Sequence, residues 1–176
     1  MLTWIIILII IAMLAVLGLA ASKPGDFRIT REAAINAPPA KVFALINDFH
    51  EWPKWSPWEK MDPAMHRTHS GAQSGKGAVY AWSGNKKVGR GRMEIIESTP
   101  PSRLGMDIEF MEPFQAKNKV EFTLTPAGGG TKLSWTMSGI RPFMLKLMGL
   151  FMNFDQMVGK DFEAGLRAIK EEAERN

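Results

Sequence analysis

The chain begins with a long apolar run and then changes to short stretches in which apolar and polar residues alternate. Leu2–Ala21 contains no charged side chain and consists mainly of Ile, Leu, Ala and Val, with Trp4 near its start. As a helix, a segment of this length spans about 30 Å, the thickness of the hydrocarbon core of a bilayer. The pattern therefore predicts a single transmembrane anchor over residues 1–21.

A cleaved signal peptide is the alternative for this segment, because Gly18–Ala20 resembles a cleavage site. However, no Lys or Arg precedes the apolar run, and the run exceeds the roughly 7–15 residues usual for the apolar part of a signal peptide. An uncleaved single-pass anchor is therefore the favoured interpretation. Lys23, Arg28 and Arg31 follow the run, which favours a membrane protein whose domain lies on the cytoplasmic side.

Residues 22–26 include a Pro-Gly pair and predict a short linker to one domain over residues 27–176. Phe27–Ile35 alternates imperfectly between apolar and polar residues, as in a first strand. From about Met65 the alternation has a period of two, and turn-forming residues divide it into five or six further strands. Such alternation predicts an antiparallel sheet with one face in water.

Two segments between the first strand and the others differ from this pattern. Pro38 and Pro39 indicate the start of a short helix that ends near Asn47-Asp48, with Val42, Leu45, Ile46 and Phe49 on its apolar face. Residues 51–59 then contain three tryptophans and two prolines. Because Pro53 and Pro57 remove backbone donors and fix φ, we expect a rigid loop rather than a helix or a central strand.

The last stretch has the period of a helix. Pro142 suits a first helical turn, and apolar residues then recur three and four apart towards the C-terminus. The pattern predicts one long helix, whose first half is apolar nearly all round and needs cover on more than one side. Its apolar positions are Leu147, Phe151, Phe154, Val158, Phe162, Gly165 and Ile169. The fold class is therefore α+β, with this helix covering the dry face of the sheet.

Composition and charge narrow the function classes. The net charge of +4 is compatible with an anionic membrane surface, but no dense basic stripe is present, so no nucleic-acid partner is expected. The absence of cysteine excludes disulfides, thiolate catalysis and Cys-ligated zinc. His66 and His69 would point to opposite faces of a strand and lack a third ligand, so neither a metal site nor a cofactor is predicted.

The predicted inner face of the sheet and helix is rich in methionine and aromatic residues. Methionine adapts to varied apolar partners, and a curved sheet closed by one helix often encloses an apolar cavity. Glu59, Tyr80 and Asp155 are the candidate polar anchors. A carboxylate in such a cavity has a raised pKa and can act as an acid, a base or a hydrogen-bond partner. The predicted ligand-binding residues are Trp58, Glu59, Tyr80, Trp82, Met93, Met106, Ile108, Phe110, Phe122, Trp135, Met148, Met152 and Asp155. The alternative is that the apolar members only fill a core and the carboxylates reach solvent.

The chain also resembles a known family. The segments that carry the resemblance are Ile35–Ile46, Asp48–Glu59, Tyr80–Asn85, Gly89–Ile95, Pro100–Leu104, Gly130-Thr131 with Trp135, and Asp161–Leu166. In this order they are similar to the polyketide cyclase/dehydrase-like branch of the START-related (SRPBCC) superfamily, from Phe27 to the end of the chain. The resemblance implies a helix-grip fold, in which a curved antiparallel sheet wraps around a long C-terminal helix with an apolar cavity between them. It supplies no catalytic motif.

Three functions remain open at this stage. The favoured one is a membrane-anchored module that binds a hydrophobic small molecule or lipid, with transport of that ligand as an extension of the same function. The second is a cyclase or dehydratase that uses a buried carboxylate and the tyrosine as acid and base. The third is a module without a ligand, in which the apolar start of the last helix docks against the membrane or an unknown protein partner.

Overall fold

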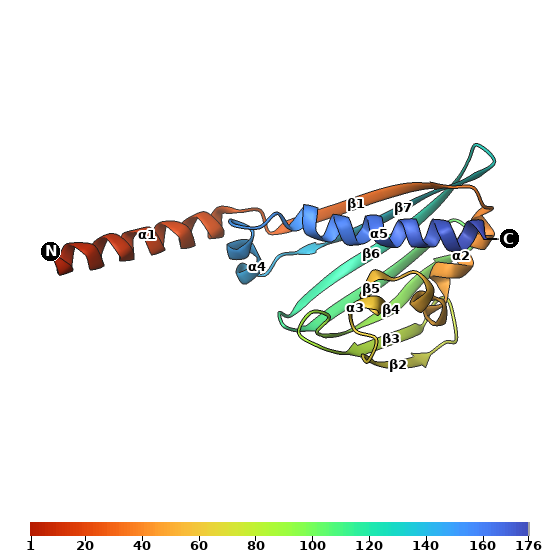
Figure 1. Cartoon of the computed structure of the whole chain (residues 1–176), viewed down its shortest axis with the longest axis horizontal. Helices are drawn as coiled ribbons and strands as arrows, with labels where there is room; N and C mark the ends of the chain where they lie inside the picture. Colours follow the sequence, from red (N-terminus) through yellow and green to blue (C-terminus); the bar gives the residue numbers. More distant parts are fainter. Residues whose placement is uncertain (176) are drawn as a thin grey trace.

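The computed structural model describes residues 1–175 as one long apolar helix followed by an α+β domain (Figure 1). Helix α1 (Leu2–Ser22) projects away from the domain, and almost all of its side chains are exposed. Strand β1 begins at Asp26, so the connection between helix and domain is short. The other elements are α2 (Pro39–Asn47), the 3₁₀ helix η1 (Phe49–Lys54), α3 (Pro57–Met61), α4 (Phe143–Met148), α5 (Phe154–Glu174) and the strands given below.

One sheet of seven strands forms the frame of the domain. Its order is β1-β7-β6-β5-β4-β3-β2, and each neighbouring pair is antiparallel. The strands are β1 (Asp26–Ile35), β2 (His66–Gly71), β3 (Ala78–Ser83), β4 (Arg90–Thr99), β5 (Arg103–Glu112), β6 (Ala116–Ala127) and β7 (Gly130–Ile140). The predicted antiparallel sheet is confirmed, with six strands after the first.

The long helix α5 lies across the inner face of the curved sheet, as the helix-grip prediction required (Figure 1). Its buried side chains include Phe162, Leu166 and Ile169. The ring of Phe162 stacks on that of Trp135 from β7, with 4.2 Å between the ring centroids. Gly165 permits this approach, because a Cβ there would lie 2.7 Å from the Trp135 ring. The helix therefore packs against the sheet through aromatic contact at a glycine.

The prediction of one unbroken C-terminal helix is wrong. Helix α4 ends at Met148, and α5 begins at Phe154 after an irregular connection. Glycine is a poor helix former, and an asparagine can cap a new helix. Gly149 ends α4, and the Asn153 side chain accepts a hydrogen bond of 3.0 Å from the backbone N–H of Gln156. Phe151 was expected to stabilise the fold, but it lies in the break and is 78% exposed.

The tryptophan-rich segment is also more regular than the predicted loop. It forms η1 and the short helix α3, with Pro57 in the first turn of α3, where a missing N–H costs nothing. The indole N–H of Trp52 donates to the carbonyl of Ile46 at 3.1 Å. That of Trp55 donates to the carbonyl of Leu45 at 2.8 Å. These two bonds fix the segment against α2 and over the inner face of the sheet.

Candidate functional site

Burial along the inner face of strand β5 decreases towards the end of the sheet that follows α1. On β5, Leu104 and Met106 are fully buried, whereas Ile108 and Phe110 are only half-buried. Strand pairing places Ile108 opposite Asn118, Asn118 opposite Gly139, and Gly139 opposite Phe27 near the start of β1. The half-buried residues therefore lie at the end of the sheet nearest α1. We use the term grip for the space between the inner face of the sheet and α5. We call Trp82, Ile108, Phe110 and Asn118, which lie on this inner face nearest α1, the anchor-side end of the grip.

Asn118 is a polar residue in this otherwise apolar set, and the sequence analysis missed it. Its side chain is buried, and its Oδ1 has no hydrogen-bond partner among residues 1–175. Its Nδ2 lies 3.9 Å from the sulfur of Met137. Gly139 makes room for the amide, since a Cβ there would lie 2.1 Å from Oδ1. The sequence contains a signal for it: Asn118 is a polar residue two positions before Val120, at the start of the alternating apolar positions of β6.

A second unpartnered polar atom lies deeper in the grip. The indole N–H of Trp135 is buried and has no acceptor among the residues that the structure describes. Phe122 beside it, and Met106 and Met93 on the neighbouring strands β5 and β4, are buried. A vacant cavity of lipid size would leave exposed surface on its walls, so the protein's own side chains fill this deeper half. Trp58 is half-buried above it, with its ring 5.8 Å from that of Trp135.

Two of the predicted polar anchors meet on the side of the grip formed by β2 and β3. The hydroxyl of Tyr80 donates a hydrogen bond to Oε1 of the buried Glu59. Nε of Arg67 lies 2.6 Å from the other carboxylate oxygen. Burial, and secondly the hydrogen bond to Glu59, raise the pKa of the Tyr80 hydroxyl above its ordinary value. Arg67 was missed, although it lies directly opposite Trp82 in the strand pairing and therefore on the same face.

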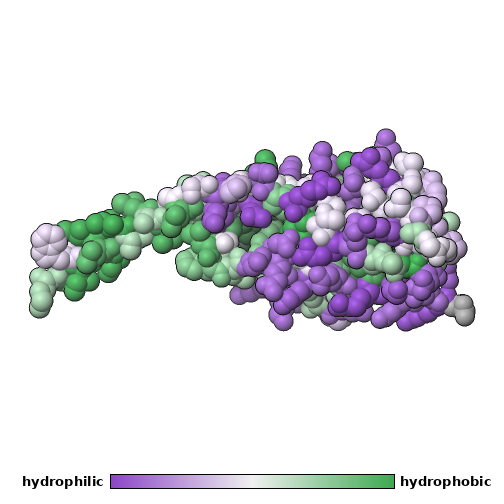
Figure 2. Space-filling model, turned by 90° about the horizontal axis from the view of Figure 1, so that it is seen from above, coloured by the Kyte–Doolittle hydropathy of each residue, from purple (hydrophilic) through white to green (hydrophobic). Residues whose placement is uncertain are grey.

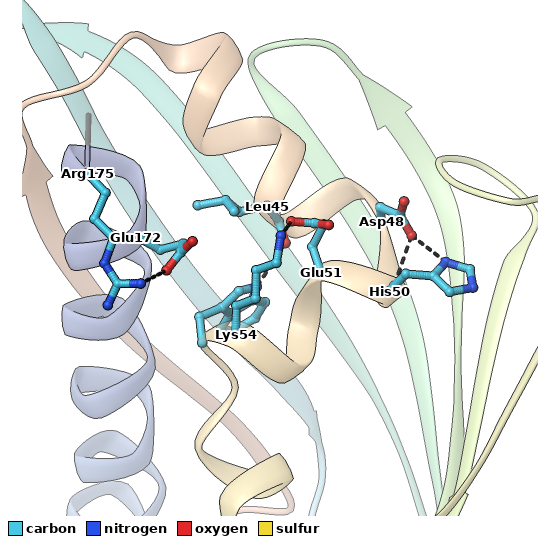
Figure 3. Close-up of polar contacts among 8 residues, drawn as sticks. Leu45, Asp48, His50, Glu51, Lys54, Glu172 and Arg175 are labelled. Carbon is cyan, nitrogen blue, oxygen red and sulfur yellow. Dashed lines mark hydrogen bonds and ion pairs between the residues drawn. The ribbon is translucent and has the colours of Figure 1, made fainter.

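A pair of histidines adjoins this cluster at the edge of the sheet. The ring of His69 stacks on that of His50 at 4.3 Å and lies 5.2 Å from the Tyr80 ring. Nδ1 of His50 lies 2.7 Å from Oδ1 of Asp48. Figure 3 shows this contact between the two side chains. Burial, and secondly the charge of His50, lower the pKa of His69. The arrangement extends the polar cluster from Glu59 to the surface.

The three predicted site residues on the last helix lie elsewhere. Met148 belongs to α4, which packs beside α1, and Met152 is 49% exposed in the helix break. Asp155 is half-exposed and pairs with Arg31 at 2.9 Å. Because the helix is broken, its first part turns towards α1 instead of lying in the grip. The expectation that these residues face the grip is therefore wrong.

Two hollows are defined at the α1 end of the domain. One of about 300 Å³ lies at the β5–β6 hairpin, and Phe110 forms part of its wall. The other, of about 390 Å³, is lined by Arg141 and residues 149–155, which include Met152 and Asp155. Both are shallow features of the surface and not a closed chamber between sheet and helix.

The geometry described above defines a helix-grip protein with an apolar inner face. The model of the family described as polyketide cyclase / dehydrase and lipid transport matches residues 26–174. The chain therefore belongs to this family. No curated protein matches it.

Solved structures share the fold at low sequence identity. Protein CV1439 from Chromobacterium violaceum is 16% identical, with a TM-score of 0.60 over 87% of this chain and 100% of that one. The Aha1 protein from Colwellia psychrerythraea, solved as a dimer, is 15% identical, with a TM-score of 0.61 over 84% and 96%. An uncharacterised protein from Rhizobium leguminosarum is 15% identical, with a TM-score of 0.62 over 86% and 96%. At these identities the comparison establishes the fold alone.

Proposed function

We propose that the protein is a membrane-anchored module that binds a hydrophobic small molecule or lipid at the anchor-side end of the grip. The observation that carries this proposal is the direction of the burial gradient along β5: its apolar inner face becomes accessible, at Ile108 and Phe110, at the end that follows α1. A ligand leaving a bilayer would meet this end first. The family, which includes lipid transport in its description, supports a hydrophobic ligand.

Helix α1 supports the membrane part of the proposal. It is the one helix in residues 1–175 that is long and apolar enough to cross a membrane, and its 21 residues match the hydrocarbon thickness. Ile5, Ile9 and Leu14 are exposed, so the domain provides no cover for them. An uncleaved α1 would keep the domain within a few residues of the bilayer surface.

The interior supplies the features that such binding needs. Asn118 and Trp135 would give a ligand's polar group an acceptor and a donor that the protein leaves free. Met93, Met106 and Met137 have flexible side chains that can move aside when a ligand enters. Binding therefore requires repacking of the filled interior, and not merely entry into a chamber.

Native mass spectrometry of the full-length protein, released from membranes in a mild detergent, tests the proposal. We expect a co-purified apolar molecule on the wild type and its loss in Ile108→Glu, which places a charge at the anchor-side end. Ile96→Glu is the matched control, because Ile96 is an exposed residue of β4 away from the inner face. Absence of any bound apolar molecule, together with no thermal stabilisation by added fatty acids or isoprenoids, would overturn the proposal.

Catalysis of a cyclase or dehydratase reaction is a second candidate, which one observation favours. Tyr80 and Glu59 face each other and could serve as acid and base. Against it, the Glu59 carboxylate is already bound by Arg67, and both side chains are buried by the protein itself. If the reaction occurs, Tyr80→Phe abolishes turnover of the bound molecule but leaves its retention unchanged.

A further inference from the structure

The hollow lined by Arg141 and residues 149–155 lies where the domain meets α1. Helix α4 lies beside the C-terminal end of α1 (Figure 1). The segment that connects α4 to α5 forms part of the wall of the hollow. The backbone N–H of Arg141 donates to the carbonyl of Gly25 at 2.7 Å, which holds the end of β7 beside the linker. If α1 spans the bilayer, Arg141 lies at the level of the lipid headgroups.

Arg141 offers hydrogen-bond donors that the protein does not use. Its Nε is buried and unpartnered, and its guanidinium forms no ion pair within the described chain. The guanidinium carbon lies 5.5 Å from the ring centroids of both Phe27 and Phe154. Cation–π contact of this kind holds the group in place and leaves its N–H donors free. Asp155 also lines the hollow, but its carboxylate is paired with Arg31 at 2.9 Å.

Large apolar side chains are exposed close to the hollow, on α4 and in the helix break. Phe143 and Met144 on α4, with Phe151 and Met152 in the helix break, are 48%, 47%, 78% and 49% exposed. Figure 2 shows the hydrophobic surface of α1 continuing onto the adjacent part of the domain. Large exposed apolar side chains next to a transmembrane segment are suited to the acyl region of a bilayer. A cationic group beside such a surface matches an amphipathic ligand.

We propose that this hollow binds the phosphate of an anionic phospholipid from the leaflet in which α1 ends. The planar guanidinium of Arg141 donates to the phosphate oxygens, a geometry that arginine can satisfy with two parallel bonds. Phe151 and Met152 contact the adjoining acyl chain. The site is separate from the inner face of the grip, but it rests on the part of the proposed function that places α1 across the bilayer.

Native mass spectrometry of the full-length protein, titrated in detergent with phosphatidylglycerol or phosphatidylcholine, tests the site. We expect the wild type to retain phosphatidylglycerol in preference, and Arg141→Gln to weaken that retention by about tenfold or more. Arg141→Lys keeps the charge without the planar fork and should fall between the two. Arg28→Gln is the matched control, since Arg28 is exposed at the same end of the sheet and neighbours Phe27.

Three outcomes would overturn the proposal. The first is equal retention by the wild type and by folded Arg141→Gln, with folding checked by the melting temperature. The second is equal retention of both lipids by the wild type. The third is complete displacement of phosphatidylglycerol by inorganic phosphate, which would identify the ligand as a free anion. The two proposals can fail separately, because Ile108 does not line the hollow. Ile108→Glu should therefore leave the retention of phosphatidylglycerol unchanged, whether or not the grip binds an apolar molecule.

Discussion

At the scale of single residues, Asn118 is a position where a polar side chain lowers stability and, in the proposed function, contributes to binding. A buried, unpartnered polar atom costs about 1–3 kcal/mol of stability. The chain retains one beside Met137, in a part of the sheet that is otherwise apolar. Such a cost is expected where the atom has a partner in another state of the protein, which under the proposed function is the ligand-bound state.

Substituting Asn118 with leucine should therefore stabilise the protein and impair binding. We expect Asn118→Leu to raise the free energy of unfolding by about 1 kcal/mol, because an apolar side chain of similar size replaces an unpaired amide. Thermal melting in detergent measures the first effect, and native mass spectrometry of the co-purified molecule measures the second. A destabilised variant would show that Asn118 has a structural role instead.

Tyr80 permits a direct check on the buried cluster, because it is the one tyrosine of the chain. Its raised pKa means that the folded state holds the phenol proton more tightly than the unfolded state does. The resulting stability is fully present below the unfolded pKa of about 10 and is lost as the pH rises through the folded value. Ultraviolet titration should show no tyrosinate near pH 10 while the protein remains folded.

Glu59→Gln is the comparison for this titration. It removes the negative charge that contributes to the raised pKa of Tyr80, so tyrosinate should appear at lower pH than in the wild type. It also leaves Arg67 without its carboxylate partner, which we expect to destabilise the protein by about 2 kcal/mol, given that Arg67 is partly exposed. Tyrosinate at pH 10 in the folded wild type would contradict the hydrogen-bonded arrangement.

At the scale of elements, helix α5 offers two glycines that test how the helix contacts the sheet. A Cβ on Gly165 would lie 2.7 Å from the rigid ring of Trp135, and one on Gly159 would lie 2.0 Å from the flexible end of Arg31. Alanine favours a helix over glycine by about 1 kcal/mol at either position. The two substitutions therefore differ only in what the added methyl group meets.

We expect Gly165→Ala to lower the free energy of unfolding by about 1–3 kcal/mol, because Trp135 and Phe162 must separate to admit the methyl group. Gly159→Ala should be close to neutral, since Arg31 can move towards solvent. Thermal or denaturant unfolding of both variants in one detergent measures the difference. Equal effects would show that α5 does not pack tightly on Trp135.

The cap of α5 can be tested in the same way. Asn153→Ala removes the side-chain acceptor of the Gln156 N–H and should destabilise the protein by about 1 kcal/mol. Asn153→Asp retains an acceptor and is the control. If Asn153→Ala were neutral, the break between α4 and α5 would have to be explained by Gly149 alone.

Sequence patterns predicted the sheet better than the last helix. Strands such as β5 have one apolar and one polar face, so their period of two is visible in the sequence. The break at residues 149–153 was hidden because the residues around it are apolar for a different reason, their exposure beside α1. Asp155 was misplaced for the same reason, whereas the Glu59–Tyr80 contact depended on pairing between elements that no local pattern records.

At the scale of the whole molecule, α1 packs beside α4 but contributes little to the hydrophobic core of the domain. Ala20 is the buried residue of α1, and the core cluster consists of residues of the domain from Phe27 onwards. Removing residues 1–22 should therefore leave a folded domain, with circular dichroism and a cooperative melt unchanged in character. The exposed apolar side chains of α4 and of the helix break should make this fragment self-associate, which sedimentation velocity would detect. Phe151→Glu, in the helix break, should reduce the association. An unfolded fragment would contradict this small contribution of α1.

The short connection between α1 and β1 has a kinetic consequence. Three residues separate the two elements, and the backbone N–H of Arg141 donates to the carbonyl of Gly25, so the domain stays within a few residues of the end of the helix. If α1 crosses the bilayer, the protein and any lipid-soluble ligand move in the same plane. Their encounter is then a search in two dimensions, and its rate depends on the ligand's density in the leaflet instead of its concentration in water.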